Sequence, residues 1–294
     1  MDAQENSRRE FLRRAAALLP GVALLPRALQ DTLFTTDRTI ILKRFARGME
    51  EDLFKLPMGD LVAAMGRTFL ERPYEANTLE APGPEHLVVN LREFDCVTLC
   101  ETSLALARAI KLHASTAFGY ERQLQEIRYR GGRCEGYASR LHYFSEWIDD
   151  NVKKHVVQNV TAALGGVKET RSLDFMSTHR EAYPRLADAA DFAAIVAMER
   201  ALRGRTRYSV PKAHVARIEG SIQNGDIIAI TTDVRGLDVA HTGIAVREGG
   251  VTKLLHAPNV GQQVQITSGS LAAYLAAHRA QTGIMVARPL DPSS

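Results

Sequence analysis

The sequence predicts an α+β fold in which a helical N-terminal half packs on an antiparallel sheet. Two observations support this. Apolar residues in the first half recur at helical spacing, and from residue 225 onward short apolar runs alternate with Gly, Asp and Asn turns. With 294 residues, 45% of them hydrophobic, the chain is long enough for one substantial core. No internal repeat or low-complexity linker divides it, so residues 31–294 are expected to form a single domain.

Two helices and a short strand are expected in the first half. Apolar side chains at helical spacing predict a helix over residues 58–70. Residues 86–91 have the composition of a strand, and residues 97–110 are rich in the Leu and Ala that favour a helix. Because this second helix begins directly after Asp95, Cys96 is expected at a helix N-terminus.

The middle of the chain is predicted to be a helical insertion, at about residues 111–205, because its composition favours helices. The sheet follows it. Its strands are expected at residues 226–230, 241–246, 253–256 and 284–287.

The first thirty residues resemble a twin-arginine export signal. Residues 7–12 (SRREFL) supply paired arginines, and a short apolar run over 15–25 follows them. An amphipathic surface helix is the alternative, but Pro20 and Pro26 would interrupt it. The run is too short for a stable membrane span. We therefore expect export to the periplasm and a mature start near residue 30, although no small-x-small triplet closes the segment and retention as an N-terminal anchor stays open.

The charge balance limits the classes of partner. The formal net charge is +3, and the first thirty residues contribute +2 of it, from five Arg against three acidic residues. The remaining chain is nearly neutral and has no broad cationic field. Neither nucleic acid nor an acidic membrane surface is therefore expected as a partner. A small or weakly charged molecule is expected as the partner instead.

The cysteines suggest a free thiol. Cys96, Cys100 and Cys134 are too few, and odd in number, for a disulfide framework. A buried structural role is the commoner fate of a lone cysteine. The position of Cys96 argues for chemistry instead, because backbone N–H groups and the dipole at a helix N-terminus favour the thiolate and can later hold an oxyanion.

Two histidines are placed to assist such a thiol. His241 begins one apolar strand and His256 ends the next, so a hairpin would bring the two imidazoles side by side. A single histidine is more often structural than catalytic. A thiol on a helix, a base on a strand and an orienting group on the neighbouring strand is, however, the arrangement by which papain-type enzymes hydrolyse amides. The chain lacks His-Glu-x-x-His, and neither a metal nor another cofactor is expected.

Several motifs resemble the NlpC-type branch of papain-like cysteine peptidases. These are Phe94-Asp95-Cys96-Val97-Thr98, Gly225-Asp226-Ile227-Ile228, His241-Thr242-Gly243-Ile244-Ala245 and Leu255-His256-Ala257. Others look like the N-acetylmuramoyl-L-alanine amidase-like family within it. These are Pro73-Tyr74 with Thr78-Leu79-Glu80, residues 128–132 (RYRGG) and residues 136–147 (GYASRLHYFSEW). The resemblance runs from about residue 40 to the C-terminus.

The resemblance implies a papain-like NlpC-type fold and cleavage of the bond between the lactyl group of N-acetylmuramic acid and L-Ala in muropeptides. Some members look specific for anhydro-muropeptides. Carried over by position, Cys96 is the nucleophile, His241 the general base and acid, and His256 the orienting residue. The backbone N–H of Cys96 and a second, unidentified donor would hold the oxyanion. Cys100 departs from the pattern, since an apolar or aromatic residue is usual there, and core packing is its expected role.

Two other activities stay open. One is an endopeptidase that cuts between D-Glu and the diamino acid of the stem peptide. The other, of a different class, is an inactive peptidoglycan-binding module, which the joint presence of Cys96, His241 and His256 argues against.

Substrate-binding residues are predicted from spacing and resemblance. Arg140, Tyr143 and Trp147 fall at i, i+3 and i+7, so on a helix they would share a face. Arg140 would meet a stem-peptide carboxylate, and the two rings would stack on sugar. The alternative, favoured equally, makes both rings core residues and Arg140 a structural ion-pair partner. Tyr74 and Glu80 are expected in loops beside the cleft.

Overall fold

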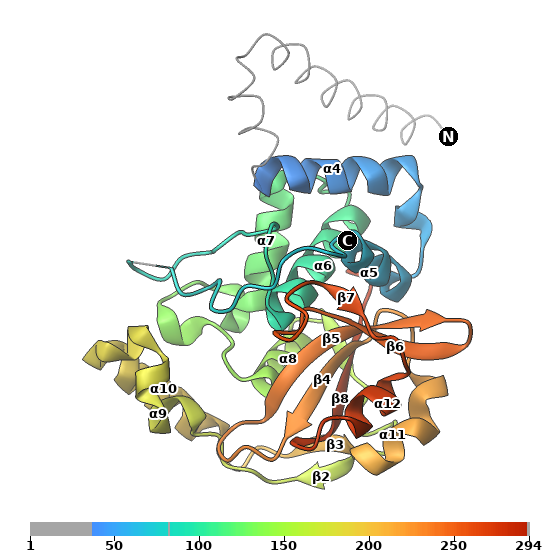
Figure 1. Ribbon diagram of the computed structural model, residues 1–294. Helices are drawn as coiled ribbons and strands as arrows, with labels where there is room; N and C mark the ends of the chain where they lie inside the picture. Colours follow the sequence, from blue (N-terminus) through green and yellow to red (C-terminus); the bar gives the residue numbers. More distant parts are fainter. Residues whose placement is uncertain (1–36, 82, 293–294) are drawn as a thin grey trace.

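An antiparallel sheet with helices on both faces organises the chain (Figure 1). The computed structural model describes residues 37–81 and 83–292, so the predicted export signal at 1–30 lies outside the described residues. The strands follow the order β2-β3-β8-β4-β5-β6-β7, and β1 also pairs with β8. They are β1 (Val157–Asn159), β2 (Val167–Glu169), β3 (Arg207–Pro211), β4 (Ile227–Thr232), β5 (Val239–Glu248), β6 (Val251–His256), β7 (Gln265–Ile266) and β8 (Gln281–Pro289).

The helices differ greatly in length and burial. They are α4 (Asp37–Glu50), α5 (Met58–Arg67), α6 (Cys96–Lys111), α7 (Ala117–Arg128), α8 (Phe144–Lys153), α9 (Phe175–Thr178), α10 (Ala189–Leu202), α11 (Lys212–Ile218) and α12 (Leu271–Ala276). Short 3₁₀ turns lie between some of them. Within the described residues, no helix is long and apolar enough to cross a bilayer.

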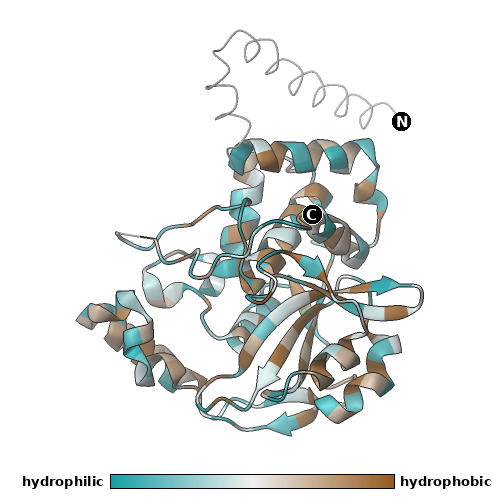
Figure 2. Ribbon diagram, in the orientation of Figure 1, coloured by the Kyte–Doolittle hydropathy of each residue, from teal (hydrophilic) through white to brown (hydrophobic). Residues whose placement is uncertain are grey.

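The central strand β4 explains how two layers of helices share one sheet. All six of its residues are buried. Because successive side chains of a strand point to opposite faces, Ile227 and Ala229 join the core formed with α5 and α6, whereas Ile228 and Ile230 join the core formed with α11 and α12. Figure 2 shows apolar residues along the central strands and hydrophilic ones at the tip of the β5–β6 hairpin.

The start of α6 is specified by its own first residues. The Asp95 carboxylate accepts a hydrogen bond from the Thr98 N–H at 2.7 Å, and the Thr98 hydroxyl accepts one from the Asp95 N–H at 2.9 Å. Such a capping box satisfies two backbone donors and is worth about 1 kcal/mol. The rest of the helix is buried on nearly all sides through Ile110. The cap therefore fixes Cys96 as the first helical residue, at one end of a rigid element.

Most predicted elements are confirmed. The helix expected at 58–70 is α5, which ends at Arg67, and the helix expected at 97–110 is α6. The four predicted strands correspond to β4, β5, β6 and β8.

The strand predicted at residues 86–91 is wrong. This segment has no strand assignment and pairs with no other strand. Side chains take the carbonyls that a neighbouring strand would bind: Arg128 Nη1 donates to the Val88 carbonyl at 2.6 Å, and the Tyr129 hydroxyl donates to that of His86 at 2.9 Å. The apolar composition thus reflects packing beside α7, and not sheet formation.

The segment expected as a helical insertion is not purely helical. It supplies α7, α8 and α10, but β1 pairs with the central strand β8 through Val157 and Pro289, and β2 pairs with β3. Trp147 of α8 is fully buried in the main core. A further apolar cluster, which includes Tyr143 and Ile195, joins the segment before α8 to α9 and α10.

Candidate active site

Cys96 lies half-buried at the first position of α6, where it faces strand β5. Its sulfur accepts hydrogen bonds from the backbone N–H and the hydroxyl of Thr242 and from its own backbone N–H. Burial raises the pKa of the thiol to about 11; Asp95 adds to the rise, and these hydrogen bonds oppose it. The resting side chain is therefore a neutral thiol, held by donors that would also stabilise a thiolate.

The second cysteine of α6 shares the same hydroxyl. Cys100 is fully buried, and its Sγ donates to the Thr242 Oγ1 at 3.8 Å. Burial raises the pKa of this thiol well above its usual value. Cys100 packs in the main core, as the sequence predicted.

The β5–β6 hairpin brings His241 and His256 together, as predicted. His241 Nε2 and His256 Nδ1 are 2.8 Å apart, and the ring centroids are 5.1 Å apart in an edge-to-face arrangement. Burial lowers the pKa of His241 to about 3, with His256 and His278 adding to the effect. Burial, followed by His278, lowers the pKa of His256 to about 4. Both rings are therefore neutral at pH 7, and the N–H of one donates a hydrogen bond to the bare nitrogen of the other.

The thiol and the histidine pair are joined through Thr242, the neighbour of His241 on β5. Within the described residues, Cys96 makes no hydrogen bond to His241 itself. Bonds of this kind often form only when substrate is bound. Because His256 occupies Nε2 of His241, Nδ1 is the nitrogen left to face a thiol.

Two residues that the sequence did not single out border the histidines. The Tyr274 ring of α12 lies 5.2 Å from that of His256 and 6.4 Å from that of His241. It also contacts the exposed ring of His278 at 4.4 Å. Burial raises the pKa of Tyr274; Gln281 lowers it by donating to the hydroxyl, and Cys96 adds to the rise. In the sequence only their i, i+4 spacing connected Tyr274 and His278, and nothing linked them to β5.

Tyr74 also lies near Cys96. Its backbone N–H donates to the Gln262 carbonyl at 2.8 Å, and it forms a parallel bridge with Phe94, two residues before the nucleophile candidate. Burial raises the pKa of Tyr74, and Cys96 and Asp95 add to the rise. The structure thus places Tyr74 beside the thiol; a role in binding substrate stays a prediction.

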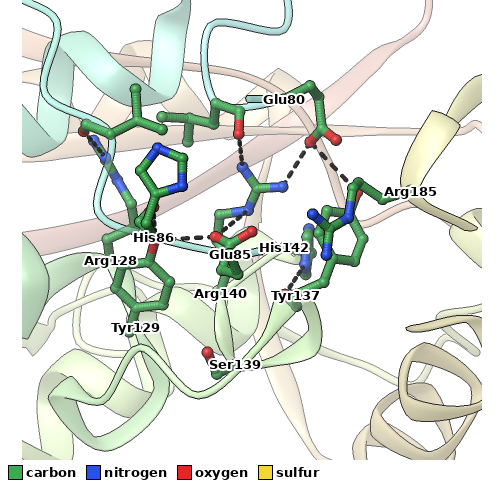
Figure 3. A network of polar contacts seen from close by, with 12 residues as sticks. Glu80, Glu85, His86, Arg128, Tyr129, Tyr137, Ser139, Arg140, His142 and Arg185 are labelled. Atoms are coloured by element: carbon green, nitrogen blue, oxygen red, sulfur yellow. Dashed lines mark hydrogen bonds and ion pairs between the residues drawn. The ribbon is translucent and has the colours of Figure 1, made fainter. Parts of the chain in front are cut away.

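Arg140 is engaged by acidic groups of the chain itself (Figure 3). Nη2 lies 2.6 Å from Oε1 of Glu80, Nη1 donates to the Leu79 carbonyl at 2.8 Å, and Nε lies 3.6 Å from Glu85. The guanidinium also lies over the Tyr137 ring, 4.9 Å from its centroid. Arg140 and Glu80 therefore tie the loop around residue 80 to the segment before α8.

The predicted helical face of Arg140, Tyr143 and Trp147 is wrong. Helix α8 begins at Phe144, and Arg140 has an extended backbone before it. The Tyr143 hydroxyl donates to Glu199 at 2.8 Å, and Trp147 Nε1 donates to Glu101 at 3.2 Å. With exposed fractions of 1% and 0%, neither ring can stack on a sugar. The alternative of core rings and a structural ion pair is what the structure shows.

Within the described residues, no three His, Cys, Asp or Glu side chains gather as metal ligands would. What the arrangement around Cys96 offers is a neutral thiol, two neutral imidazoles in contact and backbone donors at a helix start. Together these groups suit attack on a carbonyl with transfer of the thiol proton to a histidine.

Solved structures resemble this chain over most of its length. That of an N-acetylmuramoyl-L-alanine amidase from Bacteroides uniformis ATCC 8492 is 38% identical, with a TM-score of 0.75 over 79% of this chain and 99% of that chain. A protein from Bacteroides fragilis, provisionally named a xylanase, is 39% identical, with a TM-score of 0.72 over 77% and 99%. A Legionella pneumophila protein is 19% identical, with a TM-score of 0.64 over 90% and 96%, which shows the fold alone.

No curated protein matches the chain. The sequence profile of the N-acetylmuramoyl-L-alanine amidase-like family does, over residues 64–284. This span contains Cys96, His241 and His256, together with Tyr74 and Tyr274.

Proposed function

The chain belongs to the N-acetylmuramoyl-L-alanine amidase-like family, and from this premise we propose that it is a cysteine-dependent amidase that hydrolyses the lactyl–L-Ala bond of peptidoglycan fragments. The observation that carries the cysteine mechanism is the grouping of Cys96 at the start of α6 with the His241–His256 pair, through Thr242. Soluble muropeptides are the proposed substrates, and anhydro-muropeptides are the first form to test.

The cycle begins with two neutral groups. As Sγ of Cys96 attacks the lactyl carbonyl carbon, the thiol proton passes to Nδ1 of His241. This requires that His241 carry a proton on Nε2 and donate a hydrogen bond from that N–H to Nδ1 of His256, whose own proton is then on Nε2. His256 thus selects the tautomer and the ring orientation of the base. The Cys96 N–H is the proposed oxyanion donor.

Collapse of the tetrahedral intermediate breaks the amide bond. His241 gives its proton to the departing L-Ala nitrogen, which leaves a thioester between Cys96 and the lactyl carbonyl. The same imidazole then takes a proton from water as the water attacks the thioester. The products are a muramyl carboxylic acid, a free stem peptide and the regenerated thiol.

The site suits amide cleavage better than glycoside cleavage, which the name of the Bacteroides fragilis relative would suggest. Glycosidases generally use two carboxyl groups about 5–9.5 Å apart. Asp95, the carboxylate adjacent to Cys96, is already engaged by Thr98 as the cap of α6. The groups around the thiol are hydroxyls and imidazoles.

We also propose export by the twin-arginine route to the periplasm, where a substrate of this kind is found. The support is the paired arginines at 7–12 and the apolar run after them. Replacement of Arg8 and Arg9 by Lys should leave the protein in the cytoplasm in a cell-fractionation assay. Unchanged export would contradict the proposal.

Product masses test the proposed activity. Incubation of the purified protein with a defined anhydro-muropeptide should release an intact stem peptide and a free sugar acid, while Cys96→Ala releases neither. Cys134→Ala, at a half-buried cysteine outside the site, serves as the matched control and should cleave normally. A dipeptide left on the sugar would mean the endopeptidase alternative. Binding without turnover by the wild type would mean the inactive module.

A further inference from the structure

A cationic hollow of about 360 Å³ lies between α4 and the two segments that lead to the active site. Its floor and walls are Ile40, Lys43, Arg44, Arg72, Pro73, Arg92 and Glu93. Four of these seven residues are cationic and one is acidic. Helix α4 lies before residues 64–284, so the hollow combines the family's common core with an N-terminal element.

Two arginines in the hollow leave hydrogen-bonding capacity unused. Arg44 donates from Nη2 to the Thr68 carbonyl at 2.8 Å and lies 5.3 Å from the Phe69 ring centroid, yet its buried Nε has no hydrogen-bond partner among residues 37–81 and 83–292. The half-buried guanidinium of Arg72 forms no hydrogen bond or ion pair with any described residue. By contrast, Arg92 Nε lies 3.4 Å from Oδ1 of Asp37, so an ion pair already offsets part of its charge.

The two arginines also repel each other. Burial lowers the pKa of Arg44, and Arg72 adds to this more than Arg47 does. No carboxylate among the lining residues is paired with either of them. An anion between the two guanidiniums would offset the repulsion and satisfy the free N–H groups.

Two chain segments connect the lining of the hollow to the active site. Phe94 N–H donates to the Pro73 carbonyl at 3.0 Å, and Glu75 N–H donates to the Phe94 carbonyl at 3.1 Å, so the two segments run side by side. Glu93 borders the hollow, and Cys96 is three residues further, which is at most about 10 Å along an extended chain. A second residue of a bound peptide would be about 7 Å from the scissile bond.

We propose that this hollow binds a free carboxylate of the stem peptide, and that of D-glutamate in particular. The inference rests on the proposed amidase function. In a muropeptide the lactyl carboxyl is consumed by the scissile amide and the sugars carry no charge, so the anionic groups belong to the stem. Arg140, the cation first predicted for this task, is held by Glu80 and Glu85. Arg44 and Arg72 are the available alternative.

A pair of substrates tests the proposal. One muropeptide carries D-glutamate with its free α-carboxylate, and the other carries the α-carboxamide at the same position. Since a hydrogen bond to a charged group contributes more than a neutral one, the wild type should favour the acid by about tenfold or more in kcat/KM. Arg72→Gln should raise KM for the acid about tenfold, leave kcat nearly unchanged and change KM for the amide little. Arg72→Lys should recover part of the preference.

Arg217→Gln, at an exposed arginine of α11 on the other face of the sheet, is the matched control and should not alter the preference. Equal losses on both substrates, or no loss in Arg72→Gln, would overturn the proposal.

If the wild type cleaves neither substrate, the proposed function fails and the hollow is judged by binding. Calorimetric titration of the full chain with the tripeptide L-Ala-γ-D-Glu-diaminopimelate should then still show binding that Arg72→Gln weakens. Binding that does not depend on Arg72, or no binding, would overturn the proposal on its own.

Discussion

Two clusters of polar side chains, one around Arg140 and one around Cys96, differ in how their charges are handled. Arg140 is charged and lies against Glu80 and Glu85, so its positive charge offsets the negative charge of these two carboxylates. Around Cys96, burial keeps the groups neutral: it raises the pKa of the thiol to about 11 and lowers that of His241 to about 3. Paired charges hold a loop in place, whereas neutral groups that can exchange a proton are available for chemistry.

The largest expected effect is loss of turnover when one of the neutral groups around Cys96 is replaced. Cys96→Ala and His241→Ala should each lower kcat by at least about 10³-fold, because one removes the nucleophile and the other its proton acceptor. Circular dichroism and thermal unfolding should show an intact fold. Near-wild-type turnover in either variant would contradict the assignment of catalysis to the groups around Cys96. Cys100→Ala, at the core thiol one turn away, should keep most of the activity.

Substitutions in the ion-paired cluster around Arg140 should instead lower the stability of the fold. Arg140→Met leaves Glu80 and Glu85 without their cation and should lower the free energy of unfolding by about 3–5 kcal/mol. Urea denaturation measures this change. Arg133→Met, whose side chain is 76% exposed, is the control and should change stability by less than about 0.5 kcal/mol.

Removal of Glu80 as well sharpens this result. If the loss comes from an unpaired buried charge, Arg140→Met combined with Glu80→Gln should be more stable than Arg140→Met alone. A double variant whose losses simply add would contradict the role of pairing.

The orienting histidine should have an intermediate effect. His256→Ala removes the acceptor for His241 Nε2 and should lower kcat about 10²-fold, whereas His256→Asn keeps an acceptor oxygen and should retain a larger share of the rate. Steady-state kinetics on a single muropeptide compare the two. Equal rates for Ala and Asn would show that the ring, and not its acceptor, is what matters.

The smallest effect concerns pH. His241 has to be neutral to accept the thiol proton, and its pKa is lowered from 6.5 to about 3 by burial and then by His256 and His278. The protonated, inactive form therefore accumulates only as the pH falls through that lowered value, and kcat/KM should show no loss near 6.5. A pH–rate profile with its acid limb at 6.5 would be inconsistent with this. His278→Gln should move the limb slightly upward.

How far the sequence alone predicted this molecule depends on the range of each interaction. The start of α6 was predictable because Asp95 and Thr98 cap it from three residues apart. Four of the strands after residue 225 followed from apolar runs separated by turn residues, and the histidine pair from a short hairpin. The strand expected at 86–91 failed since its partners, Arg128 and Tyr129, are about forty residues away and use side chains.

By itself, then, the sequence determined the α+β class, the cysteine at a helix N-terminus and the pairing of His241 with His256, because neighbouring residues create each of these. Tertiary structure alone decided that Arg140 faces Glu80, that Trp147 is buried and that Tyr274 borders the histidines. It also decided that Arg44 and Arg72 share a hollow. The packing of elements that are distant in the sequence selects these partners. No local sequence pattern specifies which arginines or aromatic residues will contact one another in the fold.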